Sequence, residues 1–113
     1  MKETTNFKII DPFERHVHFR ELLTLMRSVF KYTARQFWGS LVMPNLKIPI
    51  TKWEQAVEYE KDIMSVAVAN GFPNFKAVLT CYLTDQTEVS NLIEGFRRGA
   101  WRAVKLYPLG ATT

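Results

Sequence analysis

His16 and His18 are the only histidines of the 113-residue chain, and they lie two positions apart in a segment with strand character. Side chains two positions apart on a strand point to the same face, so both imidazoles could bind one metal ion. Arg20 continues this alternation and would place a cation where an anionic substrate group could be held. The alternative is an edge strand with two solvated histidines and a surface arginine, because a zinc site needs three or four ligands.

Lys105 is the second residue with unusual surroundings. It lies inside Ala103-Val104-Lys105-Leu106-Tyr107, an apolar run typical of a strand in a parallel sheet. A buried ammonium is costly unless its pKa falls, an ion pair forms or the amine is covalently modified. A neutral amine is reactive enough for Schiff-base or carbamate chemistry. The other interpretation is a lysine at the strand end whose ammonium extends into water.

Two further side chains, Asn45 and Cys81, are of types that can take part in binding or catalysis. Asn45 follows Pro44 after an expected strand, so its amide could reach a ligand at the carboxyl ends of the strands. It could equally be a turn-forming asparagine. Cys81 is the single cysteine, and we expect it to pack as a small buried hydrophobe because no histidine remains to activate it.

These residues depend on an alternation of strands and amphipathic helices that predicts an α/β fold with a parallel sheet. We expect strands at about 7–19, 39–43, 75–83 and 103–107, and helices at about 21–36 and 51–69. A third helix carries a stripe that ends before Gly99. Thr51 and Glu54 have the spacing of a capping box at the start of the second helix.

Composition excludes several classes of protein. The net charge is +4 and the isoelectric point is near 9.4, but the basic residues are scattered, which disfavours nucleic-acid binding and still allows attraction of small anions. No apolar run is long enough for a membrane span, and the polar start Met1-Lys2-Glu3 disfavours a secretory signal. With one cysteine, these features favour a cytoplasmic protein.

An ordered set of motifs connects these features. His16-Val17-His18-Phe19-Arg20 is followed by Met43-Pro44-Asn45, then by Thr80-Cys81-Tyr82-Leu83-Thr84-Asp85 and by Lys105-Leu106-Tyr107-Pro108. This set, from about Ile9 to Thr113, resembles the N-terminal part of a dihydroorotase of the short bacterial type, in the amidohydrolase superfamily. The resemblance implies four parallel strands and three helices of a (β/α)8 TIM barrel. Residues 1–113 would be a single partial domain that ends after the fourth strand.

The resemblance also implies a function for each motif. His16 and His18 would bind zinc, and a carboxylated Lys105 would bridge two zinc ions. Arg20, Asn45, Thr112 and Thr113 match positions that hold or cover the substrate. The reaction would be the reversible cyclisation of N-carbamoyl-L-aspartate to dihydroorotate in pyrimidine biosynthesis, with small anionic substrates as partners.

The remaining ligands and the catalytic aspartate of the family lie on later strands, and a complete barrel takes about 250 residues. We therefore expect no catalytic residue within this chain and no activity from it alone. Open strand edges predict that it self-associates or needs the other barrel half. The alternatives are a non-catalytic half-barrel that serves as an assembly or binding module, and an amidohydrolase for another cyclic amide, which Thr80 to Asp85 disfavours.

Overall fold

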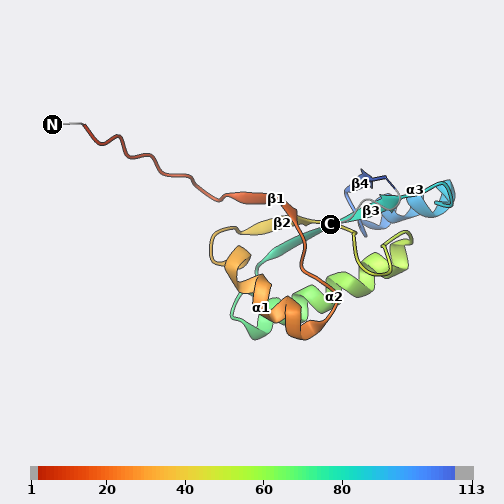
Figure 1. The fold of residues 1–113 in the computed structure, drawn as a ribbon, viewed down its shortest axis with the longest axis horizontal. Helices are drawn as coiled ribbons and strands as arrows, with labels where there is room; N and C mark the ends of the chain where they lie inside the picture. The colour runs from red at the N-terminus through yellow and green to blue at the C-terminus, as the bar shows by residue number, and fades with distance from the viewer. Residues whose placement is uncertain (1–2, 109–113) are drawn as a thin grey trace.

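The computed structural model describes residues 3–108, and within them four strands alternate with three helices (Figure 1). The elements are β1 (Phe13–Val17), α1 (Leu23–Ala34), β2 (Gly39–Val42), α2 (Trp53–Ala69), β3 (Lys76–Leu83), α3 (Val89–Arg98) and β4 (Ala103–Leu106). The strands form one parallel sheet in the order β1-β2-β3-β4. The expected four parallel strands and three helices are therefore confirmed.

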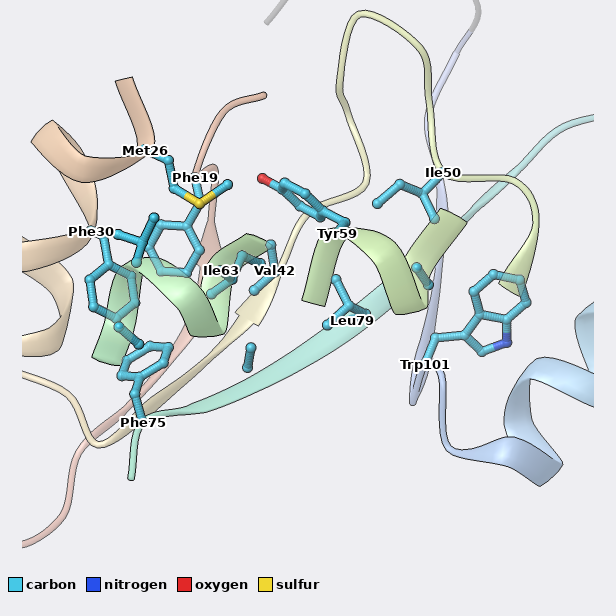
Figure 2. Close-up of a cluster of buried hydrophobic side chains, with 14 of the residues drawn as sticks. Phe19, Met26, Phe30, Val42, Ile50, Tyr59, Ile63, Phe75, Leu79 and Trp101 are labelled. Carbon is cyan, nitrogen blue, oxygen red and sulfur yellow. The ribbon is translucent and has the colours of Figure 1, made fainter. Parts of the chain in front are cut away.

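The core lies between the sheet and the helices α1 and α2, because each of these elements presents one apolar face. Figure 2 shows its aromatic end, where the Phe30 ring packs 5.3 Å from Phe19 and 4.8 Å from Phe75 between centroids. At the other end the Trp101 indole is fully buried and donates a hydrogen bond of 3.1 Å to the carbonyl of Leu92. This core anchors the end of β1 through Phe19, just before Arg20.

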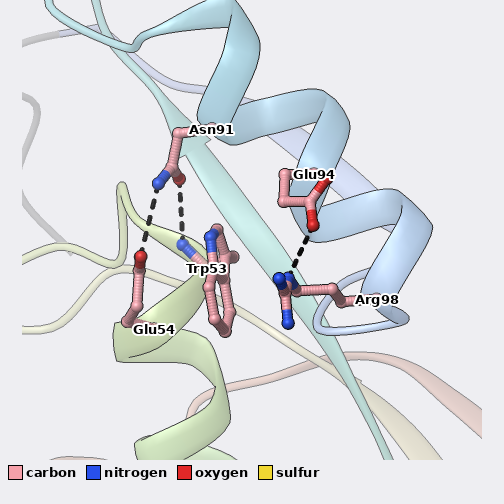
Figure 3. A network of polar contacts seen from close by, with 5 residues as sticks. All are labelled: Trp53, Glu54, Asn91, Glu94 and Arg98. Atoms are coloured by element: carbon pink, nitrogen blue, oxygen red, sulfur yellow. Dashed lines mark hydrogen bonds and ion pairs between the residues drawn. The ribbon is translucent and has the colours of Figure 1, made fainter.

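Helix α3 is joined to the first turn of α2 by a small polar network (Figure 3). The Asn91 side chain accepts a hydrogen bond from the backbone N–H of Trp53 at 3.0 Å and donates one to Glu54 at 3.3 Å. The Arg98 guanidinium lies 4.4 Å from the Trp53 ring centroid and pairs with Glu94 at 2.7 Å. An otherwise unpaired donor at the start of α2 is thus satisfied by a neighbouring helix.

The structure corrects two expectations from the sequence, the extent of the first strand and the cap of the second helix. The first strand begins at Phe13, and the preceding segment is extended away from the body without a ladder partner among residues 3–108 (Figure 1). The capping interaction of α2 uses Gln55, whose side chain accepts from the backbone N–H groups of Thr51 at 3.0 Å and Lys52 at 2.9 Å. The expected capping pair of Thr51 and Glu54 is therefore wrong, because the helix is capped at Lys52 and Gln55 is the residue three positions further on. The expected strand at 7–19 is too long at both ends, because only Phe13–Val17 forms the strand beside β2. Among residues 3–108 no helix is long and apolar enough to span a membrane.

Candidate metal and anion site

The face of the sheet opposite the helices carries the residues expected to bind metal. On β3 the buried residues Ala77, Leu79 and Cys81 belong to the core, so Thr80 and Tyr82 face the other way. Tyr82 pairs in register with Lys105 of β4, and neighbouring residues in register share a face. Lys105 therefore lies on the open face of the sheet.

An irregularity in β1 brings the two histidines to the same open face. Glu14 pairs with Ser40 and Val17 pairs with Val42, so β1 contains one residue more than β2 over this stretch. Val17 packs against the core, which leaves His16 and His18 on the opposite side. The bulge is accompanied by a hydrogen bond of 3.0 Å from the backbone N–H of His16 to the Glu14 carboxylate.

The geometry of the histidine pair suits two ligands of one metal ion. The Nε2 atoms of His16 and His18 are 3.2 Å apart. Two imidazoles on a tetrahedral zinc, with Zn–N bonds of about 2.0–2.1 Å, have nitrogens about 3.3 Å apart. The pair thus fits half of a zinc coordination sphere. Within residues 3–108 no group of three His, Cys, Asp or Glu side chains could complete it.

Electrostatics favour the metal-binding form of His18. Its pKa lies below the ordinary value because the imidazole is partly buried and because Lys105, His16 and Arg20 add positive charge nearby. A neutral imidazole is the form that binds a metal ion. Lys105 and Arg20 therefore lie close enough to His18 for their positive charges to affect its pKa.

Lys105 is half-buried on an end strand of the described sheet, and burial lowers its pKa. Its ammonium lies 4.9 Å from the ring centroid of Tyr107. Neither of the two ion pairs found in the described part of the chain involves Lys105. Of the ways to accommodate this lysine, an ion pair with a described carboxylate is not used, whereas a lowered pKa, a modification and an ammonium that extends into water are all compatible with its half-buried position.

Arg20 and Asn45 line one cavity of about 380 Å³ between the end of β1 and the loop after β2. Lys47 and Glu21 line it as well, so two cations, one carboxylate and an amide surround the same space. The Oδ1 atom of Asn45 is buried and has no hydrogen-bond partner among the described residues. The two cations outnumber the single carboxylate of Glu21, and this excess of positive charge favours a ligand with a carboxylate group.

The structure thus brings together five of the seven residues predicted from the sequence. His16, His18 and Lys105 share the open face, and Arg20 and Asn45 share the adjoining cavity. Thr112 and Thr113 lie outside the described residues, and the roles of all seven stay predictions.

Cys81 is fully buried in the core, as expected, and burial raises its pKa to about 11.

Two residues of this region were not singled out by the sequence. Lys47 follows Asn45 by two positions, and that spacing was the available signal. Tyr59 donates a hydrogen bond from α2 to the backbone carbonyl of Arg20. This contact joins positions 39 apart in the chain, so no local pattern could have predicted it.

The fold and the site together define a class: the first half of a (β/α)8 barrel with a histidine pair on β1 and a lysine on β4, both facing the open side of the sheet. Comparison with known proteins points within this class to dihydroorotases. The chain is 43% identical to the dihydroorotase of Erythrobacter litoralis over 110 residues, which are 97% of this chain and 31% of that protein. It is 42% identical to the dihydroorotase of Photorhabdus laumondii over 111 residues, again 31% of the relative.

Solved structures give the same result. The chain superimposes with a TM-score of 0.78 and 30% identity on the dihydroorotase of Saccharomyces cerevisiae crystallised with 5-fluoroorotic acid, covering 89% of this chain and 26% of that one. For the dihydroorotase of Campylobacter jejuni the TM-score is 0.77 at 25% identity, with 91% and 28% covered. No family model matches the chain. The resemblance to dihydroorotases is confirmed, and the chain spans about 30% of the length of these curated relatives.

Proposed function

We propose that this chain supplies the first four strands of a zinc-dependent dihydroorotase, a cytoplasmic enzyme of pyrimidine biosynthesis. In one direction water adds across an amide C–N bond of the dihydroorotate ring and gives N-carbamoyl-L-aspartate, and in the other direction the ring closes with loss of water. The observation that carries the proposal is the pair of Nε2 atoms 3.2 Å apart on the same face as Lys105, in a chain 43% identical to a dihydroorotase.

In this proposal three side chains hold the metal. His16 and His18 would bind it through their Nε2 atoms, and the neutral Lys105 amine would add to carbon dioxide with release of a proton, which would give a carbamate whose oxygens could serve as further zinc ligands. A lowered pKa supports this reaction, because only the neutral amine attacks carbon dioxide. Zinc bound there supplies a Lewis acid for the carbonyl of the ring amide.

The cavity of Arg20 and Asn45 would hold the carboxylate common to both substrates. The guanidinium can donate two parallel hydrogen bonds to a carboxylate, and Lys47 adds a second positive charge. A substrate anchored there would lie beside His18, since the Arg20 charge acts on that imidazole. By the same resemblance Thr112 and Thr113 would also contribute to substrate binding.

The test uses the protein that carries this chain in its cells, purified with zinc and bicarbonate and assayed for ring opening of dihydroorotate. We expect activity in the parent, and in Lys105→Ala we expect loss of at least half of the bound zinc together with the activity. Lys76→Ala, which removes an exposed lysine at the opposite end of the neighbouring strand, is the matched control and should retain both. Equal zinc content in Lys105→Ala and the parent would remove Lys105 from the metal site.

The carbamate has its own signature. Protein prepared with ¹³C-bicarbonate should show a carbamate carbon resonance that is absent in Lys105→Ala and present in Lys76→Ala. The isolated 113-residue chain should show no ring opening, because the described residues offer no third histidine or acidic ligand. Activity from that chain alone would contradict the need for residues beyond it. A protein that binds neither zinc nor dihydroorotate in its full-length form would favour the non-catalytic half-barrel.

A further inference from the structure

The backbone of Arg20 has a conformation that arginine rarely adopts. Its φ is +71°, in the left-handed region, where the β-carbon crowds the backbone and glycine is favoured. Such a residue persists only where surrounding contacts hold it in place, and these residues cluster at functional sites. The turn follows directly on Phe19, which is fully buried, so the core fixes the chain on one side of Arg20.

Tyr59 holds the turn from the other side. Its hydroxyl donates a hydrogen bond of 2.8 Å to the carbonyl oxygen of Arg20, and the residue as a whole is only 6% exposed. Figure 2 shows the Tyr59 ring among the core side chains with its oxygen at the margin of the cluster, on the side of Phe19. Burial raises the pKa of this hydroxyl, so it remains a donor throughout the physiological range.

The turn has a consequence for the anion cavity. An arginine in ordinary extended or helical backbone would direct its side chain elsewhere, because φ sets the direction of the Cα–Cβ bond relative to the chain. In the observed turn Arg20 lines the same cavity as Asn45 and Lys47. Tyr59 is not among the described residues that line this cavity. It can therefore affect anion binding only through its hydrogen bond to the Arg20 backbone.

We propose that Tyr59 is a positioning residue for anion binding: its hydroxyl fixes the left-handed backbone of Arg20 and thereby directs the guanidinium toward the carboxylate that Asn45 also faces. This inference rests on the proposed function for the identity of the anion. The core keeps the tyrosine ring in either case, so the hydroxyl alone carries the effect.

The test compares Tyr59→Phe with the parent in the full-length protein. We expect a rise of about tenfold in the KM for dihydroorotate, with kcat changed less than twofold, because one hydrogen bond that orients a binding group is lost. A second readout is the affinity for succinate, a dicarboxylate that needs no catalysis, and its Kd should rise by a similar factor. Tyr32→Phe removes a hydroxyl from a tyrosine that is 61% exposed on α1 and should change neither value.

A double variant separates positioning from a general effect on the fold. If Tyr59 acts through Arg20, Tyr59→Phe should weaken succinate binding no further in the Arg20→Ala background. Independent, multiplying effects of the two substitutions would overturn the inference, as would an unchanged KM and Kd in Tyr59→Phe. An unchanged Kd in Arg20→Ala would instead contradict the carboxylate role of Arg20 in the proposed function, and with it the role of Tyr59. Loss of binding in Arg20→Ala but not in Tyr59→Phe would contradict the positioning role alone.

Discussion

Burial shifts the pKa of three side chains, Lys105, Tyr59 and Cys81, and each shift has a different consequence. Lys105 is half-buried on the open face, and its lowered pKa makes the amine more reactive. Tyr59 is buried under the turn at Arg20, and its raised pKa preserves a hydrogen-bond donor. Cys81 is fully buried on the helix side of β3, where a raised pKa suppresses the thiolate. The same physical effect thus favours reaction at one residue, orientation at another and inertness at the third.

The thiol of Cys81 gives a prediction at this scale. With a pKa of about 11, the folded chain should react with a thiol reagent at pH 8 at least 100-fold more slowly than the unfolded chain, because the thiolate is the nucleophile. Labelling with Ellman's reagent with and without guanidinium chloride measures the ratio. Equal labelling rates in the two states would contradict the burial of Cys81.

The same group gives the sign of a pH effect on stability. The unfolded thiol loses its proton near pH 8.5, whereas the folded thiol keeps it to about pH 11. The contribution of Cys81 to stability is therefore fully present below pH 8.5 and is lost as the pH rises toward 11. The stability difference between the parent and Cys81→Ala, measured by urea unfolding, should change over this range and stay constant below it.

At the scale of elements, a bulge in β1 orients the two histidines, and a glycine in α3 makes room for Trp101. The bulge in β1 between Glu14 and Val17 turns the two histidines away from the core. In α3, Gly95 is buried directly against Trp101, and a β-carbon at this position would overlap the indole ring. The close approach lets Trp101 fill the space beneath α3 just before β4 begins.

Gly95→Ala should therefore destabilise the chain, although alanine is the better helix former. The overlap with Trp101 should cost about 1–3 kcal/mol, which exceeds the helix-propensity gain of up to about 1 kcal/mol. Urea unfolding measures the difference, and Ser90→Ala, at an exposed position of the same helix, should stay within about 0.5 kcal/mol of the parent. In a Trp101→Phe background the cost of Gly95→Ala should shrink, and an unchanged cost there would show that the indole is not its cause.

At the scale of the molecule, the described sheet has two open edges, β1 and β4, and an open face with the candidate site. On β4 the side chains of Val104 and Leu106 lie on the face opposite Lys105, and both are exposed, Leu106 to 78%. Parallel sheets are ordinarily covered on both faces, so this arrangement suits an element that packs against further protein. Whether that protein is the remainder of a barrel or a second copy of the chain is what association measurements decide.

We expect the isolated chain to self-associate through this strand. Leu106→Glu places a charge on the exposed apolar side of β4 and should weaken association several-fold in sedimentation velocity. Val68→Glu, at a position on α2 that is 60% exposed, is the matched control and should leave association unchanged. A parent chain that remains monomeric at high concentration would contradict the expectation, and equal weakening by both substitutions would place the contact elsewhere.

The sequence determined much of this protein because its signals are local. Alternation and helical periodicity predicted all seven elements and the parallel sheet, and Gly99 ends α3 in the left-handed conformation expected of a terminating glycine. Spacing alone predicts that His16 and His18 share a face, and the ordered motifs by themselves indicate dihydroorotases. The apolar residues on both sides of Lys105 predicted a partly buried lysine for the same reason, because neighbours in a strand determine the surroundings of a side chain.

Packing between distant parts of the chain sets which face of the sheet carries the histidines and what surrounds them. A strict alternation from Glu14 would have turned His16 toward the helices, and the bulge against β2 reverses this. The meeting of Arg20 with Asn45 in one cavity, and the hold of Tyr59 on the Arg20 backbone, join loops and a helix that are distant in the chain. Such contacts follow from how packed elements come together, and a one-residue slip in strand pairing is enough to change them, so they cannot be predicted from local sequence.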